Sequence, residues 1–512
     1  MMEWMEIVIL SLYFAVLGVL AAYGLHRLAL AISLARRAPG AESARLSLDA
    51  SAPHVTVQLP IFNERYVAER LIDAVSALDY PRDRLEIQVL DDSTDETREL
   101  VSQVVDRHRA AGVDIVHLHR TDRCGYKAGA LAAGLDVAKG DLVAVFDADF
   151  VPQGDFLRRA VPAFADPEIG MVQARWGHIN REYSMLTRVQ SILLDAHFVV
   201  EHAVRERLGC FFNFNGTAGI WRRQAIEEAG GWTHDTLTED LDLSYRAQLK
   251  GWGFHYLPDV VVPAELPAEV NAYKSQQHRW AKGSVQTARK LLGTVLRAPI
   301  DRRAKLEAFI HLTANFTYPL MLLLSLLIFP AMALRQGEER WRLLAFDLPL
   351  FMAATLSVVV FFLVSQARGR LPGDATSAPA GPLSMWRCLL SMPGLMAVGI
   401  GLSVNNSFAV FSGLRHDGGV FHRTPKYKLE GKGAGRNSQG WAGKAYALRK
   451  NLSFYLEALL ALYFIGCFLA AIQLGMWWSM PFLWLFLQGY VYMTWLGVEP
   501  AFGPRRQQPV PA

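Results

Sequence analysis

Two groups of aspartates stand where a metal ion could be bound. Asp91-Asp92 and Asp147-Ala148-Asp149 each follow a short apolar stretch that is predicted to be a strand. At a strand end, the two carboxylates of the second group can face one hard cation, and Mg²⁺ or Mn²⁺ is commonly held by carboxylates and substrate phosphates. An isolated Asp-x-Asp is more often a solvated turn, but a second acidic strand end at the same sheet edge favours a metal site.

A further acidic motif, Thr238-Glu239-Asp240, precedes residues 241–250, whose apolar spacing predicts an amphipathic helix. A carboxylate at this place can cap the helix or interact with its dipole. It can equally serve as the general base that removes the proton of a sugar hydroxyl. The motif alone is compatible with both roles.

Gln276, Arg279 and Trp280 are spaced i, i+3 and i+4 on a predicted helix and therefore share one face. An amide, a guanidinium and an indole together suit a pyrophosphate and the apolar face of a sugar ring. They could also anchor an interfacial helix, because residues 281–296 place Lys and Arg opposite apolar residues. The two interpretations are compatible, since an interfacial helix can carry the motif.

Three other side chains carry weaker signals. Lys127 begins a predicted helix, 127–138, where a phosphate is favoured, although alone it would pass for a surface lysine. His197 and His202 lie on one helical stretch, but a spacing of five is wrong for joint metal ligation. We therefore expect both histidines to be structural.

These motifs fall in a region, 37–305, with the pattern of an α/β domain. Strands predicted at 55–59, 85–90, 114–118 and 142–146 alternate with helices, which predicts a parallel sheet covered on both faces. Ligands bind such sheets beyond the carboxyl ends of the strands, where the acidic groups lie. The first strand is followed by Pro60-Ile61-Phe62-Asn63-Glu64 rather than by a Gly-rich phosphate loop. A dinucleotide-dependent dehydrogenase or a P-loop NTPase is disfavoured on that ground.

Long apolar stretches flank this region. Of the 512 residues, 52% are hydrophobic and 20% are charged, against about 25% charged in an ordinary soluble domain. About 20 apolar residues are needed to cross a membrane, and the stretches 7–35, 309–334, 343–365 and 452–496 all qualify. The first is too long for a signal-peptide core and predicts an uncleaved anchor. The last breaks near 475–478, which predicts a hairpin of two spans.

The apolar stretch 388–414 is interrupted by Pro and Gly and becomes polar at Asn405-Asn406-Ser407. Cytoplasmic loops carry the excess of Lys and Arg. Basic residues follow the first, third and last spans, and the stretch 415–450 is very basic. All of these regions lie on the same side of the membrane only if 388–414 does not cross it. We therefore predict an interfacial or re-entrant segment and five crossings, with the N-terminus outside. The alternative is that 388–414 crosses and the basic stretch is external.

Taken in order, the four motifs resemble those of processive family 2 glycosyltransferases with a GT-A catalytic fold. The wording is similar to plant cellulose synthase-like A and C proteins, which are glucomannan and glucan synthases, in residues 58–64, 88–95, 125–131, 214–219 and 276–280. The resemblance implies an α/β GT-A (Rossmann-like) cytoplasmic catalytic domain and an α-helical transmembrane domain of about five spans. The expected parts are an N-terminal transmembrane helix at 1–36, the catalytic domain with its interfacial helix at 37–305, two spans at 306–366, an interfacial helix and basic segment at 367–451, two spans at 452–498 and a tail at 499–512.

The same resemblance implies roles for individual residues. Asp240 would be the catalytic base, and Asp147 and Asp149 would hold the diphosphate through Mg²⁺ or Mn²⁺. Phe421 to Lys426 is similar to the gating loop of cellulose synthases, although its wording departs from that of the known sequences, and its candidate residues are Thr424 and Lys426. The remaining candidates are, for the nucleotide sugar, Asp91, Lys127, Gln276 and Arg279, and, for the acceptor, Trp280, Phe214, Gly216 and Thr217.

By this resemblance the protein would be an inverting hexosyltransferase of the plasma (inner) membrane. It would extend and export a β-linked glucan, mannan or glucomannan from UDP-glucose or GDP-mannose. The nearest alternative is a transferase that glycosylates a lipid, such as ceramide or a polyprenyl phosphate, and a more remote one is a non-catalytic transporter. The balance of 52 basic and 48 acidic residues does not suggest nucleic acid binding. The sequence identifies no partner subunits beyond donor, acceptor and bilayer.

Overall fold

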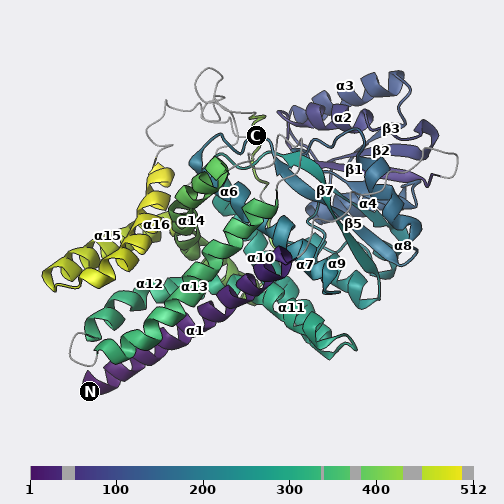
Figure 1. Cartoon of the computed structure of the whole chain (residues 1–512). Coiled ribbons are helices and arrows are strands. Elements are labelled where there is room, and N and C mark those ends of the chain that lie inside the picture. Colours follow the sequence, from purple (N-terminus) through teal and green to yellow (C-terminus); the bar gives the residue numbers. More distant parts are fainter. Residues whose placement is uncertain are drawn as a thin grey trace.

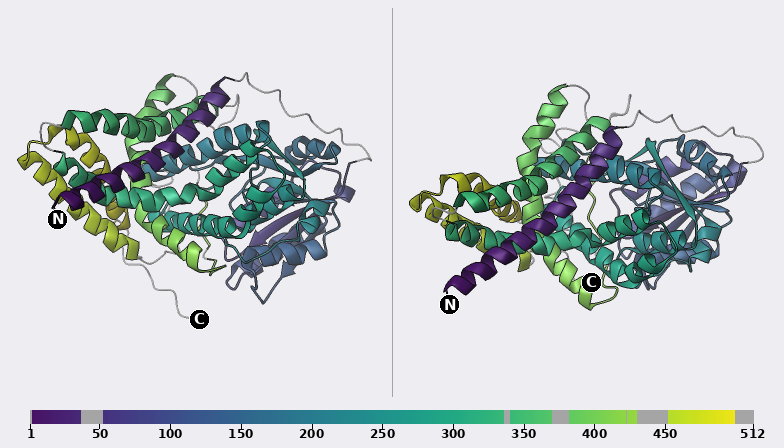
Figure 2. Two further views of the ribbon diagram at one scale, coloured as in Figure 1. Left: turned by 90° about the horizontal axis from the view of Figure 1, so that it is seen from below. Right: turned by 60° about the horizontal axis from the view of Figure 1, so that its bottom comes forward.

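The computed structural model describes residues 2–36, 52–335, 340–369, 382–421, 423–429 and 452–498. An α/β domain lies beside a group of long helices, and α1 (Met2–Ala35) runs from the far end of that group to the domain (Figures 1 and 2). The predicted combination of an α/β fold with a set of long helices is therefore confirmed. Most of the basic stretch after 429 and the tail 499–512 lie outside the described residues.

Seven strands form one sheet in the order β3-β2-β1-β4-β6-β5-β7. The four predicted strands are confirmed, and they run parallel to one another. The prediction of an entirely parallel sheet is wrong, because β6 lies antiparallel between β4 and β5. The strands are β1 (Val55–Ile61), β2 (Leu85–Asp91), β3 (Ile115–His119), β4 (Leu142–Val145), β5 (Ile169–His178), β6 (Gly219–Arg222) and β7 (Gly253–Ala264).

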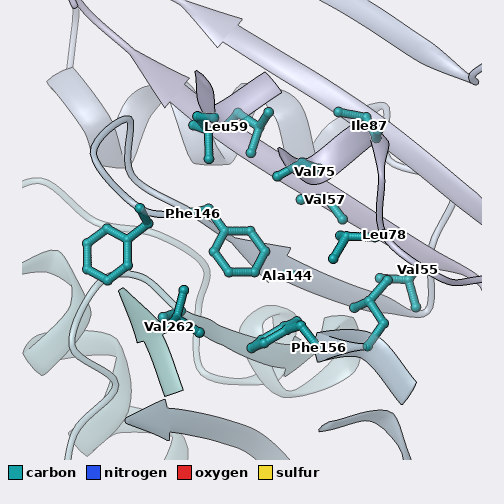
Figure 3. Close-up of a cluster of buried hydrophobic side chains, with 14 of the residues drawn as sticks. Val55, Val57, Leu59, Val75, Leu78, Ile87, Ala144, Phe146, Phe156 and Val262 are labelled. Carbon is teal, nitrogen blue, oxygen red and sulfur yellow. The ribbon is translucent and has the colours of Figure 1, made fainter. Parts of the chain in front are cut away.

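Alternation along the strands builds a core on each face of the sheet, because successive side chains point to opposite faces. Val57 and Ala144 belong to one buried cluster, whereas Val143 and Val145 belong to another. The first cluster, part of which is shown in Figure 3, contains side chains of α2 and α3, and the second contains side chains of α4, α8 and α9. These helices are α2 (Ala68–Ser76), α3 (Thr97–Ala110), α4 (Tyr126–Asp136), α8 (Arg223–Glu228) and α9 (Glu239–Leu249).

Five of the described helical segments are long and apolar enough to cross a membrane. They contain α1, the pair α11 (Arg302–Thr313) and α12 (Thr317–Leu334), α13 (Arg340–Arg368), α14 (Pro382–Arg415) and α15 (Leu452–Gln473). The predicted hairpin is present, because α15 turns at Gly475 to Ser479 into α16 (Met480–Val498). The number five agrees with the prediction, but its members differ, since α14 is among the five and α16 is not.

Both halves of α14 pack against elements that belong to the α/β domain or lead into it. Cys388 and Met392 share a buried cluster with Leu186 and Val189 of α6 (Met185–Ala196). At the other end, Gln286 of α10 (Val270–Arg297) donates to the backbone oxygen of His416 at 2.7 Å. In addition, 72% of its most apolar window is buried, against 22–33% in the other candidate spans. The middle of α14 also packs against α12 and α16, where Ile400 and Val404 share a buried cluster with side chains of both helices, so the interfacial position of α14 stays a prediction.

Cysteine labelling can test that arrangement. With α14 interfacial, a membrane-impermeant maleimide added to sealed cells should label Leu474→Cys, in the α15–α16 turn, but not Val420→Cys, just after α14. Both positions are exposed, at 53% and 63%. Cys124 is the exposed native thiol and would first be replaced by serine, whereas the other three cysteines are buried. External labelling at position 420 would show that α14 crosses.

Candidate functional site

A cavity of about 1250 Å³, which includes space open to solvent, lies at the carboxyl ends of β1, β2 and β4. The loops that follow these strands supply one wall, and α9, α10, the end of β5, the loop at residues 215–216, residues 264–267 and the segment after α14 supply others. Most of the predicted site residues meet there. The cavity is lined by Lys127, Asp147, Asp149, Gly216, Asp240, Gln276, Arg279, Trp280, Thr424 and Lys426.

Asp147 is held in place from two directions. Its backbone N–H donates to Thr217 Oγ1 at 2.9 Å, and Lys127 Nζ lies 2.5 Å from its Oδ1. Burial disfavours the charge on Lys127, but Asp147 and Glu239 outweigh it and raise the pKa of the lysine. Lys127 therefore stays cationic at the start of α4, as expected for a group that meets phosphate.

Gly216 brings backbone directly against two of these side chains. Its φ of +79° lies in the left-handed region, and its carbonyl oxygen accepts a hydrogen bond from Lys127 Nζ at 2.8 Å. A Cβ at this position would lie 2.9 Å from Asp240 Oδ2 and 3.3 Å from Lys127 Nζ. Only glycine leaves room for both groups, and it tolerates this φ without strain.

Asp240 lies at the start of α9, where Oδ1 accepts a hydrogen bond from the N–H of Leu241 at 2.8 Å. Burial and the neighbouring Glu239 raise the pKa of Asp240 to about 7, although Lys127 acts in the opposite direction. A carboxylate with a pKa near neutrality is well suited to accept a proton from a hydroxyl group. The N-cap residue of α9 is Thr238, which makes no side-chain capping hydrogen bond, whereas Asp240 lies in the first turn, where its charge can interact with the helix dipole.

Helix α10 places its motif over the acidic residues. A Cβ on Gly283 would lie 2.6 Å from Thr238 Cγ2, so this glycine lets α10 approach the start of α9 closely. About one turn earlier, Gln276, Arg279 and Trp280 face the cavity. Within the described part of the chain, Arg279 Nε is buried and has no hydrogen-bond partner. Burial lowers the pKa of Arg279, against the attraction of Glu239 and the other carboxylates.

Residues 421 and 423–429 form a segment that covers the cavity. Phe421 packs under the Arg279 guanidinium, whose Cζ lies 4.3 Å from the ring centre. Lys426 Nζ lies 2.6 Å from Asp149 Oδ2, and the N–H groups of Tyr427 and Leu429 donate to the Glu265 carboxylate at 2.7 and 3.2 Å. Thr424 and Lys426 both line the cavity, and their role in a gating loop stays a prediction.

Glu64 is a member of the cavity that sequence reasoning did not single out. It lies after β1 and forms an ion pair with Arg423 at 3.1 Å. Burial raises its pKa to about 8, with Arg423 opposing the shift and Asp149 adding to it. The available signal was its place beyond the carboxyl end of a predicted strand, the same signal that identified the aspartates.

Three predicted residues do not line the cavity. Phe214 and Thr217 are fully buried, the first among aromatic rings of the domain core and the second beneath Asp147. Asp91 is also fully buried; Oδ1 accepts from the Ser93 N–H at 2.8 Å, and Oδ2 lies 2.9 Å from His117 Nε2. Asp92 lines the cavity in its place. Asp91, His117 and His119 nevertheless form a group whose ligand atoms lie within 4.8 Å of one another.

Residues 52–283 match the family model described as glycosyltransferase like family 2. Glucomannan 4-beta-mannosyltransferase 1 of Oryza sativa subsp. japonica is 46% identical over 269 residues, which cover 52% of this chain and 51% of the relative. Glucomannan 4-beta-mannosyltransferase 2 of Arabidopsis thaliana is 48% identical over 250 residues, 48% of this chain and 47% of the relative. The matched region thus spans about half the length of these curated relatives.

Among solved structures, a mannosyltransferase from Pyrobaculum calidifontis, in complex with GDP-Man and Mn²⁺, is similar with a TM-score of 0.49 and 22% identity. That similarity covers 72% of this chain and all of the other.

Proposed function

We propose that this chain, whose residues 52–283 match the glycosyltransferase family 2 model, transfers mannose from a nucleotide sugar to a growing β-linked polysaccharide. The observation that carries this proposal is the meeting of Asp240 with Lys127, Arg279 and the two aspartates of Asp147-Ala148-Asp149 in one cavity. A proposed base, two basic side chains for a diphosphate and two carboxylates for a metal ion therefore line the same cavity.

The arrangement suits an inverting displacement. Asp240 takes the proton of an acceptor hydroxyl, whose oxygen attacks the anomeric carbon. The bond from that carbon to the diphosphate breaks on the opposite face, and the electron pair leaves with the diphosphate, close to Lys127 and Arg279. A glycoside hydrolase needs a second carboxylic acid to protonate its leaving group. Here the leaving group is already a stable anion, so one base suffices.

The residues present fit a divalent metal. Asp147 and Asp149 offer hard carboxylate oxygens on the cavity wall, the donors that Mg²⁺ and Mn²⁺ prefer. Each of these carboxylates uses one oxygen for a lysine, Lys127 or Lys426, which leaves the second oxygen of each for an ion. A bound ion would add positive charge beside the departing diphosphate.

Mannose as the transferred sugar is supported by the names of the curated relatives, which are glucomannan mannosyltransferases. GDP-mannose is accordingly the proposed donor, in preference to UDP-glucose. The helices that meet the criteria for spans support a multi-pass membrane protein. We place the α/β domain on the cytoplasmic side because the basic loops favour that side.

A direct assay tests the proposal. The purified full chain would be incubated with radiolabelled GDP-mannose or UDP-glucose and Mn²⁺ or Mg²⁺, and any polymer would be digested with β-mannanase or β-glucanase. We expect polymer from GDP-mannose that β-mannanase degrades. Label confined to the lipid extract would replace the synthase with a lipid glycosyltransferase, and no transfer from any donor would exclude both.

Transfer should be lost on acidification. Because the pKa of Asp240 is raised to about 7, its ionised form, which is the active base, predominates only above that pH. At pH 6 about a tenth of the base remains ionised, so kcat should fall by about tenfold from its alkaline plateau. Measuring kcat at saturating donor from pH 5.5 to 8.5 checks this. A flat profile across pH 7 would mean that Asp240 is not the titrating base.

Trp280→Ala should impair polymer synthesis more than donor hydrolysis. The indole lines the cavity beside Gln276 and Arg279 and is available to stack on an acceptor sugar. Such stacking contributes on the order of 1 kcal/mol beyond area burial, by analogy with aromatic pairs, so acceptor occupancy should fall about fivefold. Chain length on a polysaccharide gel is the measurement, and Trp477→Ala, in the exposed α15–α16 turn, is the control. Unchanged chain length in Trp280→Ala would contradict the stacking role.

A further inference from the structure

A π-helical turn, η3 (His197–His202), joins α6 to α7 (Ala203–Arg207) and brings two histidines together. Five residues span about 1.4 turns of an α-helix, which would put the two side chains on different faces. In the wider π turn, their ring centres lie 4.4 Å apart. A spacing of five residues, which separates two side chains on an α-helix, therefore brings them together on a π turn. Such turns are frequent at functional sites.

Both histidines bind the side-chain amide of Asn215. His197 Nε2 lies 2.9 Å from Asn215 Nδ2, and His202 Nε2 lies 2.7 Å from Asn215 Oδ1. His202 Nε2 also lies 3.1 Å from the backbone oxygen of Asn213, which can only accept a hydrogen bond. His202 Nε2 must therefore carry the proton, and the amide oxygen of Asn215 must face it.

This orientation determines the state of His197. The NH₂ group of Asn215 faces His197 Nε2, so that nitrogen must accept a hydrogen bond and cannot carry a proton. His197 Nδ1 lies 2.9 Å from Glu201 Oε2, a carboxylate that accepts, so the single ring proton lies on Nδ1. Burial and the nearby positive groups lower the pKa of His202 well below its usual value, which also keeps that ring neutral. The contacts thus support one arrangement, with both rings neutral.

Asn215 begins the part of the chain that touches the catalytic groups. Its backbone N–H donates to Gln173 Oε1 at 2.9 Å, so both the backbone and the side chain of Asn215 are held by hydrogen bonds. The next residue, Gly216, binds Lys127 and lies against Asp240, and Thr217 binds the N–H of Asp147. The loop 213–218, called the cavity frame below, therefore contacts Lys127, Asp147 and Asp240 and helps to hold them in position. Ala218, with a φ of +54°, is a strained residue that the cavity frame must hold in place.

The histidine pair connects the cavity frame to helices outside the α/β domain. Glu201 lies 3.5 Å from Arg205 NH1, and Arg205 Nε donates to Glu307 of α11 at 2.9 Å. Glu307 in turn lies 2.7 Å from His26 of α1. A continuous set of contacts between polar and charged groups therefore runs from the cavity frame to the N-terminal helix, which lies beside α7 (Figure 1).

We propose that His197 is a positioning residue, which acts through Asn215 to hold the loop 213–218 and hence Lys127, Asp147 and Asp240 in their working geometry. It reaches the reacting groups only through that loop. The assignment rests on the proposed transferase function for its kinetic consequences, but its structural consequence does not depend on activity. The loop itself should loosen when the bridge is cut.

The first test measures loop order without any assay of activity. Hydrogen–deuterium exchange of the full-length His197→Phe variant should show at least tenfold faster exchange in peptides that cover 213–218, with β1 and β2 unchanged. His197→Gln, whose amide can accept from Asn215, should restore most of the protection. His255→Phe is the matched control, because this histidine pairs with Glu206 at 2.6 Å and does not line the cavity. Wild-type exchange in His197→Phe would overturn the proposal.

Kinetics give the second test. His197→Phe should lower kcat at least tenfold while the donor KM stays within about threefold, and His197→Gln should recover much of the kcat. Equal losses in the two variants, or a loss carried by KM alone, would contradict positioning through Asn215. If the wild-type chain transfers no sugar, the proposed function fails, whereas the exchange result still decides the role of His197.

Asn215→Asp supplies a readout that a merely structural histidine would not move. The new carboxylate would face His197 Nε2, so the bridge would form only with a protonated ring. Because Asn215 lines the cavity, its new charge also acts on Asp240 directly, so the comparison is with the double variant Asn215→Asp/His197→Phe. The kcat of Asn215→Asp should peak at a lower pH than that of the double variant, and matching profiles would contradict the bridge. The titratable or charged groups that surround His197 are Glu201, His202 and Arg205 on its own helical run, Glu307 and His311 on α11, and Arg27 on α1.

Discussion

Asp240→Asn should abolish sugar transfer while leaving donor affinity within about threefold of the wild type. The substitution keeps the size of the side chain and its ability to accept from the N–H of Leu241, which lies 2.8 Å from Oδ1. It removes the negative charge of the carboxylate and with it the capacity to take a proton. General base catalysis contributes 10²–10⁴-fold, so the barrier should rise by about 3–5 kcal/mol.

The measurement combines single-turnover transfer with calorimetric titration of GDP in the presence of Mn²⁺. Asp235→Asn is the matched control, because this aspartate is exposed, pairs with Lys290 and does not line the cavity. Turnover close to the wild-type rate in Asp240→Asn would remove Asp240 from the mechanism. Loss of GDP binding would instead assign the residue to the donor site.

The parts of the fold that sequence reasoning found share one property, which is strong local patterning. The first four strands are rich in apolar residues and bounded by polar turns, and all four are confirmed within two residues at either end. The acidic groups were recognisable because each directly follows such a strand. Strands β5, β6 and β7 were not predicted, and the antiparallel direction of β6 depends on a pairing with β4 that no local pattern specifies.

Several contacts around the site depend on geometry that no local sequence pattern shows. His197 and His202 meet because of one π turn, and an α-helical reading of the same residues separates them. Glu64 and Arg423 pair across 359 positions of the chain, so their contact exists only after the segment 423–429 has folded over the cavity. Asp91 matches the motif but uses both carboxylate oxygens within the domain.

Gly216→Ala should reduce kcat by about 10–100-fold with little loss of stability beyond that of a control glycine. At a φ of +79°, alanine adopts a left-handed conformation, which costs roughly 1–2 kcal/mol for an L-residue. Gly112 has a φ of +82°, and a Cβ there would meet nothing within 4 Å. Gly112→Ala therefore carries the same backbone cost without a steric clash, and the difference between the two variants isolates the contact in the cavity.

That contact decides the size of the effect. The new methyl group would lie 2.9 Å from Asp240 Oδ2 and 3.3 Å from Lys127 Nζ, both of them at the ends of side chains. Such atoms can move aside at small cost to folding, so the thermal midpoints of the two variants should agree. Moving them displaces the base from the acceptor hydroxyl, and a misplacement of about 1 Å can cost 10²-fold in rate. A kcat within threefold of that of Gly112→Ala would mean that the position of Asp240 beside Gly216 is not the one used in catalysis.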